Sequence, residues 1–121
     1  MAIEQFLKEF PVEFQKTVRG NPPLVGNIWG IMKITQVADN QVHIEIVGGP
    51  STISASGIYS PENHNSDEPE QVLALFIHNE EEVKTYISFG SNGQIEGFGQ
   101  SLRGGTGPDQ VIGIVIRSGG G

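Results

Sequence analysis

The 121-residue chain has no cysteine, which excludes disulfide bonds, thiol catalysis and cysteine-based zinc or iron sites. Positive charge is scarce, since seven Lys and Arg stand against 14 Asp and Glu. Nucleic acid is bound largely through clustered Lys and Arg, so this acidic chain is not expected to bind it. No apolar run reaches the ~18 residues of a membrane span, and the N-terminus lacks the pattern of a signal peptide. These absences predict a cytoplasmic protein with neither a nucleic-acid nor a membrane partner.

The usual signatures of catalytic and metal sites are also missing. His43, His64 and His78 do not stand at the close spacing of a known metal motif, and no serine lies in a G-x-S-x-G pattern. The glycine-rich residues 104–107 lack the lysine of a phosphate loop and precede a predicted strand, not a helix. We therefore expect neither a metal ion nor a cofactor.

The first 20 residues show apolar side chains at spacings of three and four. They are Ile3, Phe6, Leu7, Phe10, Phe14 and Val18. This spacing predicts an amphipathic helix over 1–20, kinked or divided at Pro11, with its apolar face packed on a sheet. The run Gly20-Asn21-Pro22-Pro23 ends it.

From residue 26 to 118 the pattern has a period of two and predicts an antiparallel β meander. Strands are expected over 28–35, 42–47, 52–59, 71–78, 83–89, 94–101 and 111–116. The run 71–78 is apolar on both faces, which is typical of a strand that is covered on both sides. Asn92-Gly93 supplies the positive φ angles of the tight turn before the strand that follows.

About seven strands and one N-terminal helix predict a single domain, 1–121, of mainly β class. A closed or nearly closed antiparallel barrel, or a prism or sandwich of short sheets, accounts for strands at these intervals. If residues 111–116 form an open edge, they would pair with a second chain. A homodimer or a higher homo-oligomer is therefore expected.

His43 and Glu45 share a strand face and lie across a predicted hairpin from Lys33 and Thr35. If this face lines a barrel lumen, these groups, with Tyr59, would supply acid-base chemistry. If it faces solvent, a cross-strand ion pair of Lys33 with Glu45 is expected. The outward arrangement is favoured, because Val42, Ile44 and Ile46 make the better core.

Three aromatic side chains are candidates for gripping a ligand, namely Trp29, Tyr59 and Tyr86. For Trp29, a place in the core that closes one end of the barrel is favoured over ligand stacking. Tyr86 points away from Ile87 and Phe89 on its strand, so it is the more exposed candidate.

The C-terminal third contains Tyr86-Ile87-Ser88-Phe89, Ser91-Asn92-Gly93, Glu96-Gly97-Phe98-Gly99, Val111-Ile112-Gly113-Ile114 and Arg117-Ser118-Gly119. This order of strand and turn residues resembles part of a jacalin-like lectin repeat. The resemblance implies a β-prism that binds sugars through its loops, with Gly119 as the one site residue carried over. The aspartate that the family places a few residues beyond the Arg-Ser-Gly step is absent.

The sequence favours a non-catalytic binding protein that holds a small ligand or carbohydrate in a barrel cavity or among loops. One alternative is a small cofactor-free barrel enzyme, an isomerase, lyase or cyclase, that uses His43, Glu45 and Tyr59. The other is a protein-interaction or inhibitor module that acts through the loop 60–70 or the strand 111–116. An enclosed cavity would separate the first two from the third.

Overall fold

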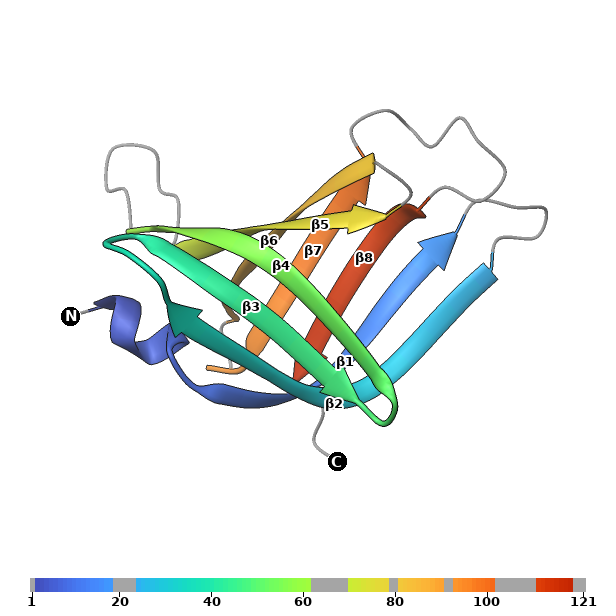
Figure 1. Ribbon diagram of the computed structural model, residues 1–121, viewed down its shortest axis with the longest axis horizontal. Helices are drawn as coiled ribbons and strands as arrows, with labels where there is room; N and C mark the ends of the chain where they lie inside the picture. The colour runs from blue at the N-terminus through green and yellow to red at the C-terminus, as the bar shows by residue number, and fades with distance from the viewer. Residues whose placement is uncertain are drawn as a thin grey trace.

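The computed structural model is a closed barrel of eight antiparallel strands preceded by a short 3-10 helix (Figure 1). The structure describes residues 2–18, 24–61, 70–78, 81–90, 93–101 and 111–118. The elements are η1 (Ala2–Phe6), β1 (Glu9–Val18), β2 (Leu24–Gln36), β3 (Gln41–Gly48), β4 (Ser51–Ser60), β5 (Gln71–His78), β6 (Glu81–Phe89), β7 (Ile95–Ser101) and β8 (Val111–Ser118). Of the architectures expected from the sequence the closed barrel is confirmed, with eight strands rather than about seven.

The barrel closes between its first and last strands. β1 pairs with β2 on one side and with β8 on the other, and every other strand pairs with its neighbours along the chain. Residues 111–116 therefore do not form the open edge on which the expected pairing with a second chain depended, because β8 is hydrogen-bonded to both β7 and β1. Closure removes the unpaired backbone groups that would recruit a second chain by strand addition.

The predicted N-terminal helix is also wrong. Among residues 2–18, which are the described part of this segment, only Ala2–Phe6 is helical, as one 3-10 segment, and residues 9–18 form β1. Val12 and Phe14 face the interior, which is the alternation of a strand. Pro11 is tolerated because β1 pairs only with β2 at this point, and its pairing with β8 begins at Val12.

The inner face of the barrel is an apolar core. The inward face predicted for β3 is confirmed, since Val42, Ile44 and Ile46 are all buried, and Met32 and Ile34 of β2 are buried with them. The side chains that are fully enclosed and largest are Phe6, Met32, Ile44, Ile46, Ile87, Ile116, Val12, Val72, Val83 and Thr85. Alternate residues of each strand fill the centre, so the barrel is packed rather than hollow in the part that the structure describes.

The 3-10 helix covers one end of the barrel, beside the end of β2 (Figure 1). Phe6 is fully buried there, with ring centroids 5.8 Å from Tyr59 and 5.0 Å from Phe89. The segment is tied to β2 by the amide of Ile34, which donates to the carbonyl of Lys8 at 3.2 Å. One buried aromatic ring thus covers this end of the barrel, where a long helix packed on the sheet was expected.

The turns follow local chemistry closely. Gly93 has a φ of 79°, as the predicted Asn-Gly turn requires, and its amide donates to the carbonyl of Gly90 at 2.9 Å. Between β2 and β3, Gln41 and Ala38 exchange backbone hydrogen bonds of 3.2 and 3.3 Å.

Within the described residues, no helix is long and apolar enough to cross a membrane.

Candidate functional site

The lumen offers no room for the predicted acid-base group. His43 and Glu45 are on the outer face of β3, opposite Thr35 and Lys33 of β2 as expected. Tyr59 faces the interior of β4 and is buried. Two residues outside the barrel and one inside cannot act on one bound molecule, so these three groups do not form a common site.

The contacts of Tyr59 indicate a structural role. Its hydroxyl donates to Oε2 of Glu70 at 2.8 Å, and its amide donates to the carbonyl of Asn40 at 2.7 Å. Burial, reinforced by the hydrogen bond to the Glu70 carboxylate and by its charge, raises the pKa of Tyr59 to about 12. The phenol therefore stays protonated at neutral pH and links the end of β4 to the residue that precedes β5.

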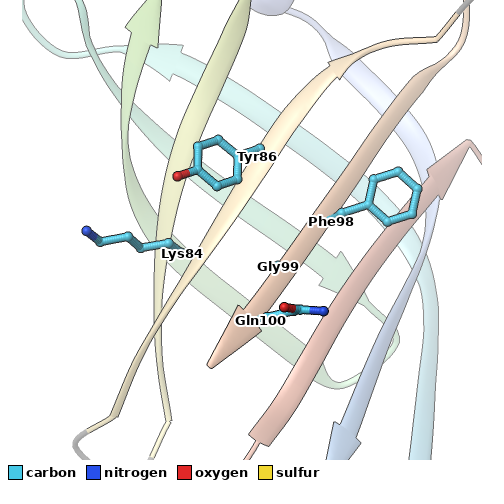
Figure 2. Close-up of a pocket in the computed structure, with 5 residues that line it drawn as sticks. All are labelled: Lys84, Tyr86, Phe98, Gly99 and Gln100. Carbon is cyan, nitrogen blue, oxygen red and sulfur yellow. The ribbon is translucent and has the colours of Figure 1, made fainter. Parts of the chain in front are cut away.

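One groove lies outside the barrel, over β6 and β7. It has a volume of about 330 Å³ and is lined by Lys84, Tyr86, Phe98, Gly99 and Gln100. Figure 2 shows the rings of Tyr86 and Phe98 pointing away from each other, with Gly99 between them. Tyr86 faces outward as predicted and is 47% exposed, although Trp29 rather than Tyr86 is the most exposed of the three candidates, and Phe98 is 58% exposed. The groove is mostly apolar, with one ammonium group and one amide at its side.

A second aromatic group faces outward on the opposite side, over β1 and β2. Trp29 is 60% exposed, so its predicted place in the core is wrong. Its register neighbour on β1 is Glu13, which is only 9% exposed although it also faces outward. Asn27 Nδ2 donates to Glu13 Oε2 at 2.8 Å, and Gln15 Nε2 makes a longer contact of 3.5 Å with the same oxygen. We call Trp29, Asn27, Glu13 and Gln15 the Trp29 cluster.

The geometry of the Trp29 cluster fixes the orientation of the Asn27 side-chain amide. A carboxylate only accepts hydrogen bonds, so Asn27 must turn its NH₂ group toward Glu13. The exposed Asn27 then presents its carbonyl oxygen and second N–H to solvent, two residues along β2 from the indole. Because Glu13 is nearly buried, this orientation is held firmly. An exposed ring and an oriented amide are thus prepared side by side.

Two other predicted sites fall mainly outside the part of the chain that the structure describes. Gly119 and the greater part of the loop 60–70, from 62 to 69, lie outside the described residues. Among the residues that are described, no group of three or more His, Asp or Glu is arranged to hold a metal ion.

Sequence reasoning missed Glu13, Asn27 and Phe98. Glu13 lies within the segment that was predicted as a helix, and only the strand β1 places it opposite Trp29. Phe98 could have been found, because it alternates with the turn-like glycines 97 and 99 and thus faces outward with Glu96 and Gln100.

Comparisons with protein-family models, with curated proteins and with solved structures give no match for this chain.

Proposed function

We propose that this protein is a non-catalytic carbohydrate-binding protein whose site is the Trp29 cluster on the outer surface. The observation that carries the proposal is the exposed indole beside an amide held by a nearly buried carboxylate. The described inward side chains form one buried apolar cluster, which supports a site on the outer surface rather than inside the barrel.

The chemistry of the cluster fits a sugar ring. The apolar face of a pyranose packs on an exposed aromatic ring, and its adjacent hydroxyls each need a donor or an acceptor. Trp29 supplies the ring, and Asn27 supplies one donor and one acceptor in fixed orientation. Glu13 is a positioning residue here, because it acts through Asn27. Preorganised polar groups lose little entropy on binding, which favours a shallow site of this kind.

The test is a screen of the full chain against neutral oligosaccharides, followed by calorimetric titration of the tightest one. Trp29→Ala is expected to weaken binding about thirtyfold, and Asn27→Ala about tenfold. Tyr86→Ala is the matched control, since it removes an exposed ring of the other side and should leave the affinity unchanged. The proposal fails if no oligosaccharide binds, or if Trp29→Ala binds as well as the unmodified protein.

A further inference from the structure

The outward side chains of β2 continue beyond the Trp29 cluster. After Asn27 and Trp29 come Ile31 and Lys33, and all four are exposed. Outward residues of one strand lie about 6.6 Å apart, so these four side chains extend over about 20 Å of the outer surface. A single sugar ring on Trp29 covers only the first part of this line. The remaining part is open to further units of the same glycan chain.

A groove lies next to the Trp29 cluster, over β1, β2 and β3, which are neighbours in the barrel (Figure 1). Its volume is about 510 Å³. On β2 it begins with Ile31, the next outward residue after Trp29, and on β1 with Pro11, the next after Glu13. The lining residues form two register rows, namely Pro11, Ile31 and Val47, and then Glu9, Lys33 and Glu45.

The row nearer to Trp29 is apolar. Ile31 and Val47 are 43% and 42% exposed, and Pro11 between them and Glu13 is exposed as well. None of these three side chains can form a hydrogen bond, but the C–H groups on one face of a pyranose ring can pack on them. The row therefore suits a second sugar unit, which needs apolar contact below its ring.

The row farther from Trp29 is charged. Lys33 stands in register between Glu9 and Glu45, so a donor is placed between two acceptors. A sugar hydroxyl both donates and accepts, and its hydrogen bonds to charged groups are about twice as strong as those to neutral ones. Two carboxylates and one ammonium leave the row with one net negative charge, which disfavours acidic sugars. The row therefore suits a third unit that is neutral.

We propose that the Trp29 cluster is the first of three subsites along β2, and that the protein binds an extended, neutral glycan chain of at least three units. The subsites are the Trp29 cluster, the apolar row with Ile31 and the charged row with Lys33. They follow one another along a single strand at a spacing close to the length of one pyranose unit, so a chain with extended linkages can contact all three. This inference rests on the proposed carbohydrate site and assigns its ligand class.

Calorimetric titration of the full chain with cellobiose, cellotriose and maltotriose tests the proposal. The β-linked glucose units of the first two form an extended, neutral chain, whereas the α-linked units of maltotriose form a curved one. Cellotriose should bind about tenfold more tightly than cellobiose, because its third unit reaches the charged row. Maltotriose should bind no more tightly than cellobiose.

Two variants locate the third subsite. Lys33→Ala and Glu45→Gln should each weaken the binding of cellotriose about tenfold and leave that of cellobiose unchanged. Lys84→Ala is the matched control, since it removes an outward lysine of β6 and should alter neither affinity. Circular dichroism should show all three variants folded.

The outcomes separate this inference from the proposed function. If cellobiose binds through Trp29 but cellotriose binds no more tightly, or if Lys33→Ala and Glu45→Gln leave the affinity for cellotriose unchanged, the three subsites are wrong and the Trp29 site stands. The same holds if other oligosaccharides bind and neither β-linked probe does. If no oligosaccharide binds to the folded chain, both proposals are wrong.

Discussion

The inner and outer faces of this barrel come from the same strands but have different tasks. Inward residues such as Phe14 and Ile44 fill the centre, and they are almost completely buried. Outward residues include aromatic rings such as Trp29 and Phe98, which are more than half exposed. Because packed side chains fill the interior of this barrel, a partner has to bind on its outer surface. The function is therefore sought on the outer surface, and the following substitutions test this division.

The largest contrast is expected between two aromatic truncations. Phe14→Ala removes an inward ring that packs 5.5 Å from the ring of Phe76, measured between centroids, and should lower the free energy of unfolding by about 4 kcal/mol. Trp29→Ala removes an outward ring and should lower it by less than about 1 kcal/mol. Denaturant unfolding at one fixed protein concentration measures both. Equal losses would contradict the division between a packing face and a binding face.

A second contrast lies within β2, between two of its glycines. A Cβ at Gly30 would lie 2.1 Å from the carbonyl oxygen of Val47, whereas a Cβ at Gly26 would meet nothing within 4 Å. Gly30→Ala should therefore cost about 3 kcal/mol of stability, because the backbone of β3 must move. Gly26→Ala should have no cost, or a small gain from the stiffer unfolded chain. If both variants melt alike, the close approach of β2 and β3 is not as described.

The fold was predictable where the period was unambiguous. For β2 and β3 the inward and outward residues were assigned correctly from alternation alone, and the range of β5 was predicted as found. The N-terminal segment failed because Phe10, Phe14 and Val18 are four residues apart. A spacing of four lies on one face of a helix and also on one face of a strand. Val12, which continues the alternation between Phe10 and Phe14, was the signal for a strand.

The candidate sites were predictable only in part. Tyr86 was identified because its strand alternates clearly. Alternation along 28–35 places Trp29 on the face opposite Met32 and Ile34, and taken by itself this pattern already indicated an exposed indole. The contact of Asn27 with Glu13 could not be found, since it needs the register of β1 on β2. A segment predicted as a helix has no such register.

A smaller effect is expected for Tyr59, the hydrogen-bonded phenol of the inner face. Its pKa of about 12 in the folded chain exceeds the ordinary value of 10.0, so the folded state binds the proton more tightly. The stabilisation is complete below pH 10 and is lost as the pH rises toward 12. Between pH 10 and 12, the free energy of unfolding of Tyr59→Phe should therefore fall by about 2 kcal/mol less than that of the unmodified chain, as measured by denaturant titrations at several pH values. Tyr86→Phe, on the outer face, should leave that pH dependence unchanged, and an equal change in both variants would contradict the role of Glu70.

The smallest effect concerns a hydroxyl that the packed interior leaves without a partner. Thr85 is fully buried, between Ala74 and Gly99 in the register, and its Oγ1 makes no hydrogen bond. A buried hydroxyl without a partner costs stability, and a methyl group of similar shape does not. Thr85→Val should therefore raise the free energy of unfolding by about 1 kcal/mol in denaturant titrations. Thr35→Val, on the outer face of β2, should leave it unchanged, since its hydroxyl is exposed. A loss of stability in Thr85→Val would show that the hydroxyl is satisfied, for instance by an internal water molecule, and that the core is less dry than its composition indicates.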